Sequence, residues 1–145
     1  MSSEAIVLFT ESHSLLAKID VASYNSAQNM AWTSLANHGR FVALVIVGAM
    51  TATGTLDAKL QMAKDSSGTG AIDITGKAIT QMLAASDSNK VRAIELKIDE
   101  ITDTYTHVRL VLTPATAASI CGAVLIGTAP HYKPVSRPAW LAVTN

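Results

Sequence analysis

Charged residues are scarce in this chain, and their scarcity excludes several classes of protein. Asp, Glu, Lys and Arg make up 15% of its 145 residues, against roughly 25% in an ordinary globular domain. The formal net charge is zero, whereas proteins that bind nucleic acid normally carry a basic patch or stripe. We therefore expect no nucleic-acid partner. So little charge also favours association between copies, with a small neutral monomer as the alternative.

Cysteine and long hydrophobic runs are equally rare. The single cysteine, Cys121, excludes an internal disulfide and a cysteine-rich zinc site. Its apolar neighbours predict a buried thiol. The most apolar run, residues 41–50, is half as long as the roughly 20 residues that a membrane-spanning helix needs. The N-terminus carries Glu4 and lacks the basic start of a signal peptide. These features predict a protein made in a cytoplasm, without a membrane partner.

No residue pattern typical of catalysis or metal binding is present. Asp99, Glu100 and Asp103 form an acidic cluster without the regular spacing of a calcium loop, so a solvated turn is the better interpretation. The glycine-rich stretch before Lys77 lacks the Ser or Thr that follows the lysine of a phosphate-binding loop. We therefore predict no enzyme, no catalytic residue, no metal and no cofactor. Surface or loop positions are expected for the histidines, which are His13, His38, His107 and His131.

From residue 41 onward the sequence reads as a series of short strands. The continuous apolar run at 41–50 predicts a central strand buried on both faces. Residues 71–83 place Ile72 and Ile74 inward, and Gly76 marks a bulge in that strand. Residues 120–128 form the last apolar strand. Apolar and polar residues alternate in three more segments, whose inward side chains are Leu56, Ala58, Leu60 and Met62, then Ile94, Leu96 and Ile98, then Val108, Leu110 and Leu112.

Turn-rich segments separate these strands, and the first forty residues are harder to assign. Polar loops are expected at residues 65–70 and 84–90. Residues 5–10 and 15–22 are candidates for short strands. Residues 26–39 are a candidate for a helical turn that ends at Gly39.

Seven or eight short strands, with a loop about every ten residues, predict an all-β fold. We expect a single β-sandwich, jelly-roll-like, with extended N- and C-terminal arms. Residues 1–40 would form an N-terminal segment that belongs to the domain, residues 41–129 the sandwich core, and residues 130–145 the C-terminal arm.

The expected arm begins with "PHYKPVSRPAW" at residues 130–140, whose prolines favour extended geometry. Disordered ends are usually poor in aromatic residues, whereas Tyr and Trp are favoured at interfaces. We favour an arm that contacts a neighbouring subunit over one that covers its own sandwich. Trp32 either caps one end of the core or joins such a contact. The candidate contact residues are Tyr132, Val135, Arg137, Trp140, Leu141 and Trp32.

The chain resembles small structural proteins encoded in the head-gene clusters of tailed bacteriophages and prophages. The resemblance covers roughly residues 30–135 and rests on "FVALVIVGAMTATGTLDAKLQMAKDSSGTGAIDITGKAITQM", "AIELKIDEI", "YTHVRLVLTPATAAS" and "GTAPHYKPV". It implies a capsid decoration, or cement, protein on the exterior of the virion, made in the host cytoplasm. Its implied partners are the major capsid protein and further copies of itself, expected as a trimer. The candidate contact residues would then touch a neighbouring subunit or the capsid.

Two other classes stay open. The first is a different virion role, such as a head–tail connector, a tail component or a fibre-attachment protein. The second is a carbohydrate- or host-binding module, since jelly rolls also occur in lectins. Glycan sites usually combine exposed aromatic platforms with polar loops, and the two polar loops expected here contain no aromatic residue.

Overall fold

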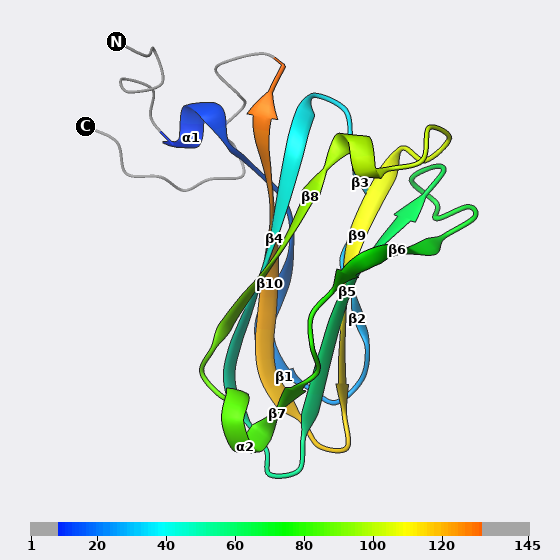
Figure 1. Cartoon of the computed structure of the whole chain (residues 1–145). Coiled ribbons are helices and arrows are strands. Elements are labelled where there is room, and N and C mark those ends of the chain that lie inside the picture. The colour runs from blue at the N-terminus through cyan, green and yellow to red at the C-terminus, as the bar shows by residue number, and fades with distance from the viewer. Residues whose placement is uncertain (1–8, 132–145) are drawn as a thin grey trace.

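The computed structural model describes residues 9–131 as two antiparallel sheets packed face to face (Figure 1). Sheet A has the strand order β1-β10-β4-β8, and sheet B has the order β2-β9-β5-β6. The strands of sheet A are β1 (Ser14–Tyr24), β4 (His38–Met50), β8 (Val91–Lys97) and β10 (Ser119–Pro130). Those of sheet B are β2 (Gln28–Asn29), β3 (Thr33–Ser34), β5 (Thr55–Ala63), β6 (Ile72–Ala78), β7 (Met82–Leu83) and β9 (His107–Ala115). The short helical elements are α1 (Phe9–Ser12), α2 (Ala84–Asp87) and a 3₁₀ turn (Ile98–Glu100).

The order of the strands is that of a jelly roll. Because β2 and β3 both pair with one side of β9, and β6 and β7 with one side of β5, the ten strands within residues 9–131 fill eight positions. Every connection between positions crosses from one sheet to the other, except the one from β5 to β6. The predicted all-β sandwich of jelly-roll type is therefore confirmed.

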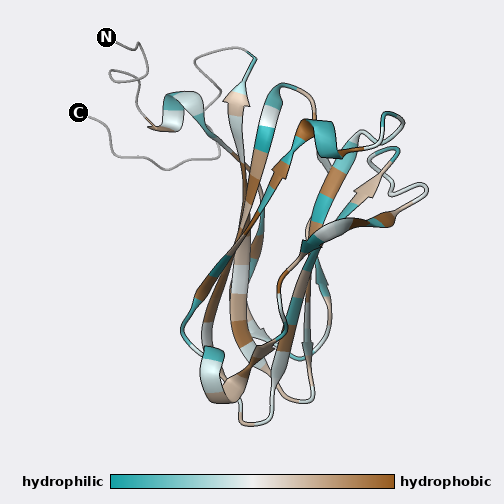
Figure 2. Cartoon of the chain, in the orientation of Figure 1, coloured by the Kyte–Doolittle hydropathy of each residue, from teal (hydrophilic) through white to brown (hydrophobic). Residues whose placement is uncertain are grey.

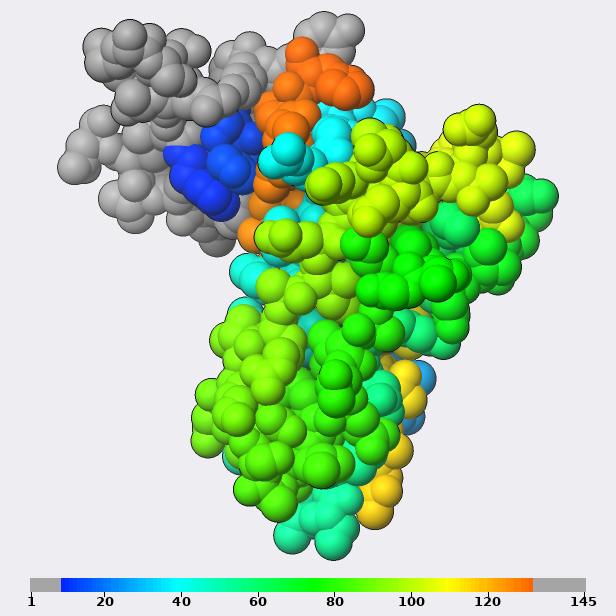
Figure 3. All heavy atoms as spheres, viewed as in Figure 1, coloured from blue at the N-terminus to red at the C-terminus, as the bar shows by residue number. Residues whose placement is uncertain are grey.

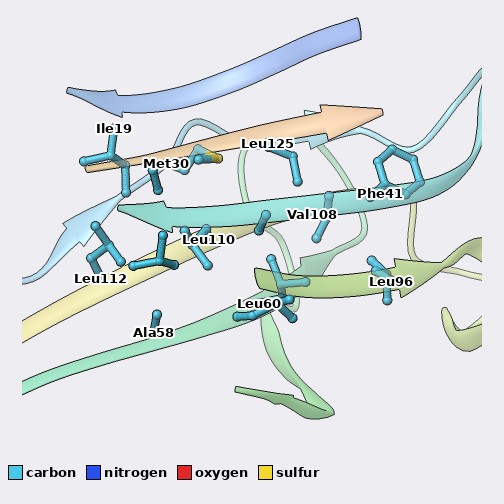
Figure 4. Close-up of a cluster of buried hydrophobic side chains, with 14 of the residues drawn as sticks. Ile19, Met30, Phe41, Ala58, Leu60, Leu96, Val108, Leu110, Leu112 and Leu125 are labelled. Carbon is cyan, nitrogen blue, oxygen red and sulfur yellow. The ribbon is translucent and has the colours of Figure 1, made fainter. Parts of the chain in front are cut away.

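Alternate side chains from both sheets fill the space between them. Phe41 and Leu125 from sheet A face Leu60 and Leu110 from sheet B, and none of the four is more than 1% exposed (Figure 4). In sheet B, hydrophobic residues recur along β5 and β9 in the period of two that this packing requires (Figure 2). The alternation predicted for β5 and β9 is confirmed, and Cys121 is fully buried as expected.

The prediction of buried side chains was wrong where the apolar sequence pattern extends beyond the region in which the two sheets are in contact. β4 is a central strand, but only one of its faces meets sheet B, so Val42 and Leu44 are half-buried and Ile46 is 40% exposed. Ile98 is exposed because the chain leaves β8 for the 3₁₀ turn at that residue. Ile72 is exposed at the start of the outermost strand of sheet B.

The first forty residues also differ in part from expectation. Residues 26–39 hold β2, β3 and a turn instead of a helical turn, and the left-handed residue is Asn37 at φ 76°, not the glycine. Residues 15–22 lie in β1 as predicted. Of residues 5–10, the described ones belong to α1 and not to a strand. The loop expected at 84–90 contains α2.

Gly76 lies at a break in the pairing of β5 with β6, as predicted. The register shifts between the pairs Lys59–Ala78 and Gln61–Asp73, so extra residues of β6 bulge out of the ladder. Gly76 has φ 78°, a left-handed conformation that glycine adopts without a steric penalty. The bulge lets β6 end before β7 resumes the pairing with β5.

His38 is buried, contrary to the expectation of a surface or loop position. It is 6% exposed, its Nε2 lies 3.3 Å from the Ser14 hydroxyl, and its ring meets Phe41 edge-on. Gly127 makes room for the ring, because a Cβ there would lie 2.7 Å from the imidazole. Burial lowers the pKa of His38, and the nearby charge of His131 lowers it further.

We expect Leu60→Ala to lower the free energy of unfolding by about 2–5 kcal/mol, because it leaves a cavity among fully buried side chains. The matched control is Lys59→Ala, at the residue before Leu60 in β5. It removes an exposed ion pair with Asp73 and should cost less than about 1 kcal/mol. Urea unfolding of both variants measures the difference. Equal losses would contradict the packing described here.

Acid should destabilise the fold through His38. Its pKa is lower in the folded state than in the unfolded chain, so the unfolded chain binds the proton more readily, and stability is lost as the pH falls below about 6.5. Urea unfolding between pH 7.5 and 5 should show this loss, and His38→Gln should reduce the slope. Several carboxylates with lowered pKa values titrate below this window. An unchanged slope in the variant would exclude His38 as its origin.

Candidate interaction surface

The outer face of sheet B is polar and internally hydrogen-bonded. The Arg109 Nε donates to the Gln61 Oε1 at 3.0 Å, and the Gln61 Nε2 donates to the Asp73 carboxylate at 2.8 Å. The Lys59 Nζ donates to the other carboxylate oxygen of Asp73 at 2.9 Å. These donors, Gln61 first, lower the pKa of Asp73. Each of these four side chains already has a partner on its own sheet, which is typical of a surface that faces water.

Trp32 lies at the end of this polar network and not in the core. The Arg109 guanidinium carbon lies 4.4 Å from the centroid of the indole, in cation–π geometry. On another side, the Gly68 loop packs so closely that a Cβ there would lie 2.6 Å from the indole Nε1. Trp32 is half-buried and is not part of the buried core cluster. The capping role is therefore not what the structure shows, and a subunit contact stays a prediction.

The outer face of sheet A is mostly apolar, in contrast to that of sheet B, and the charged residues Lys18, beside Val124, and Glu95, beside Val42, border it. The register places Val42 beside Ile126, Leu44 between Val124 and Ala93, and Ile46 beside Val91. Val21 covers Gly122, where an added Cβ would clash with it, and Ile120 packs over Gly48. We call this surface the apolar face; its residues are Val21, Val42, Leu44, Ile46, Val91, Ala93, Ile120, Val124 and Ile126.

Large side chains on the apolar face are open to solvent in the described part of the chain. Val21 is 64% exposed, Val91 55%, Ile120 41% and Ile46 40%. Contiguous apolar patches of this kind usually mark an interaction site. Sequence reasoning missed the surface. The signal that could have revealed the apolar face was the continuous apolar run in β4, which we interpreted as a strand buried on both faces.

A hollow of about 550 Å³ lies at one end of the apolar face. It is bounded by Val42, which lies on the apolar face near the start of β4, and by Thr128, two residues before the end of β10. Beside the hollow, the Lys77 Nζ pairs with Glu100 at 3.0 Å. Hydrogen bonds from the Lys97 N–H and from Lys77 lower the pKa of Glu100. The full lining is His13, Arg40, Phe41, Val42, Lys77, Glu95, Leu96, Lys97, Glu100 and Thr128.

The acidic cluster does not form a metal site. Glu100 accepts a hydrogen bond from the Lys97 N–H at 2.8 Å and pairs with Lys77, so it closes the 3₁₀ turn. Across residues 9–131, no three His, Cys, Asp or Glu side chains are placed to hold a metal ion. Over the same residues, no helix is long and apolar enough to span a membrane.

The other candidate contact residues cannot be compared with the structure. Tyr132, Val135, Arg137, Trp140 and Leu141 lie outside the described residues. Their proposed contact with a neighbouring subunit or a capsid therefore stays a prediction.

Gly68 and Gly76 offer a test of how tightly Trp32 is packed. Both have φ near 80°, so alanine is strained at either position by about 1–2 kcal/mol. An added Cβ meets nothing within 4 Å at Gly76 but meets the indole at Gly68. We expect Gly68→Ala to cost at least about 1 kcal/mol more than Gly76→Ala in urea unfolding. The excess should vanish when Trp32→Ala is present; an excess that persists would place the clash elsewhere.

Comparisons with known proteins identify the fold but not a family. No protein-family model matches the sequence, and no curated protein matches it significantly. The described fold is similar to chains in structures of infectious bursal disease virus, with a TM-score of 0.51 and 8% identity for the Gt strain and 0.50 and 11% for the Gx strain. These alignments cover 88% and 86% of this chain but 35% and 34% of those chains. The VP2 subviral particle of the same virus gives a TM-score of 0.50 at 12% identity, over 90% of this chain and 34% of that one. This chain thus spans about a third of the length of each, and the likeness is one of fold.

Proposed function

We propose that this chain is a structural protein of a virus particle that decorates the outside of the shell and stabilises contacts between its subunits. The observation that carries the proposal is the jelly-roll sandwich, which matches chains of virus particles over nearly its whole length. The scarcity of charge and the resemblance to head proteins of tailed phages support the same role. The expected partners are the major capsid protein and further copies of the chain.

Exposed apolar side chains away from the apolar face suggest where a shell would be bound. Ile72 pairs with Met62 near the end of β5, and Ile98 follows the residue of β8 that pairs with Arg40 near the start of β4. Both therefore lie at the end of the sandwich where β10 terminates, which we call the β10 end (Figure 1). Ile72 is 44% exposed and Ile98 is 41% exposed. Apolar groups at one end suit a protein that stands on a larger surface.

A ligand that binds only the assembled lattice stabilises that lattice by mass action. Purified protein should therefore co-sediment with empty shells of the major capsid protein of the same virus or prophage, saturate at a fixed ratio, and raise the temperature at which the shells disrupt. Binding only to tails or connectors would assign a different virion role. Binding to none of these particles would overturn the proposal.

Variants can locate the contact. The double variant Ile72→Ser and Ile98→Ser should weaken binding to shells at least tenfold, because it removes apolar area from the β10 end. Leu83→Ser is the matched control, since Leu83 is similarly exposed but pairs with Thr55 at the opposite end of β5. Urea unfolding would confirm that all variants fold. Equal binding by both variants would exclude the β10 end as the contact.

A further inference from the structure

The size of the apolar face limits what could cover it. Four strands spaced about 4.8 Å apart, over the six residue steps from Ile126 to Ile120, give roughly 400 Å². A stable complex between two rigid proteins needs about 800 Å² from each partner. A second sandwich laid flat on this face would therefore gain too little area, whereas a single extended segment of chain is of matching size.

The described chain ends at the edge of this same face. β10 lies between β1 and β4, and its last residue, Pro130, pairs with His38. The His131 N–H donates to the Asn37 carbonyl at 2.8 Å, so the last described residue is still paired with the residue before β4. Fourteen residues follow His131 in the 145-residue sequence. Fully extended, they span roughly 45 Å, about twice the length of the apolar face.

The hollow connects this exit with the apolar face. It reaches from Thr128, beside the exit, to Val42 on the face. In Figure 3, α1 lies next to the last residues of β10, on one side of this region. A volume of about 550 Å³ has room for the side chains that directly follow the exit. These include Tyr132 and Val135.

The spacing of apolar residues after the exit matches the spacing of the face. Val135 and Trp140 are five residues apart, or roughly 16 Å in an extended chain. Val42 and Ile46 are four residues apart on β4, or roughly 14 Å. Trp140 and Leu141 would therefore reach Ile46 and its neighbour Val91 when Val135 lies near Val42.

The prolines favour docking on the face over addition to an edge. Pro134 and Pro138 have no N–H to donate, so this segment is poorly suited to extend the sheet beside β1 or β8. Docking on a face needs side-chain contacts only. A segment held in an extended conformation by proline also loses less entropy when it docks.

We propose that residues 132–145 lie over the apolar face of their own sandwich, with Trp140 and Leu141 against Ile46 and Val91. Docking on the same chain is favoured over docking on a neighbouring copy, because a short linker gives the segment an effective concentration in the millimolar range. The inference does not depend on the proposed function, and its test uses the isolated full-length chain.

The test introduces one cysteine on the face and one in the segment. Ala93→Cys with Ala139→Cys, which the proposed register places opposite each other, should form a disulfide within one chain on mild oxidation with diamide, at the same rate at low and high protein concentration. The native Cys121 is fully buried and stays in place. The matched control is Lys59→Cys with Ala139→Cys, which puts the first cysteine on the outer face of sheet B and should react at least tenfold more slowly. Disulfide-linked dimers would show that the segment crosses to a neighbour, and equal rates would show that it does not dock; either result overturns the proposal.

Tryptophan fluorescence gives a second measurement. The chain has two tryptophans, so Trp32→Phe leaves Trp140 as the sole reporter. Acrylamide should quench Trp140 several-fold less than free tryptophanamide, and Ile46→Lys should restore quenching because it places a charge on the face. Lys59→Ala on the opposite outer face serves as the control and should change nothing. Full quenching of Trp140 before any change to the face would contradict docking.

Discussion

The packing of alternate side chains between two sheets is the constraint on which the rest of this structure depends. Phe41 and Leu125 on one sheet and Leu60 and Leu110 on the other exclude water from a common core, and neither sheet would be stable without that burial. The period of two then commits every other residue of each strand to an outer face. What the sandwich presents to its surroundings is therefore decided by those remaining residues, and here the two outer faces differ completely.

The buried positions were predicted correctly in strands that have one face in the core and the other in a polar environment. β5 and β9 alternate because one face meets the core and the other the polar network around Gln61 and Asp73. The pattern failed in β4, whose outward residues are as apolar as its inward ones, so periodicity could not tell burial on both faces from an exposed apolar face. The prediction for residues 26–39 failed for another reason: pairing of β2 and β3 with β9, about 75 to 85 residues later in the chain, overrode a weak local signal.

The surfaces could be predicted less well than the strands, because they depend on pairing between distant segments. Trp32 and Arg109 meet only because Thr33 pairs with Val108 across sheet B. The burial of His38 depends on Gly127 in a strand that pairs with β4 from the other end of the sequence. No local pattern carries that information. The aromatic residues after Pro130 were identified from composition alone, whereas the apolar face became visible only in the structure.

The proposed docking of residues 132–145 on the apolar face also changes the interpretation of the low charge of this protein. Sequence reasoning took the scarcity of charge as a sign that neighbouring subunits cover much of the surface. If residues 132–145 cover the apolar face, part of that apolar surface is internal, and Ile72 and Ile98 at the β10 end are among the exposed apolar side chains left for partners. The polar outer face of sheet B, whose groups are already paired with one another, would then remain in water. Such a division suits a subunit that stands end-on upon a lattice, because apolar side chains at the β10 end would contact the lattice while the polar face of sheet B stays in water.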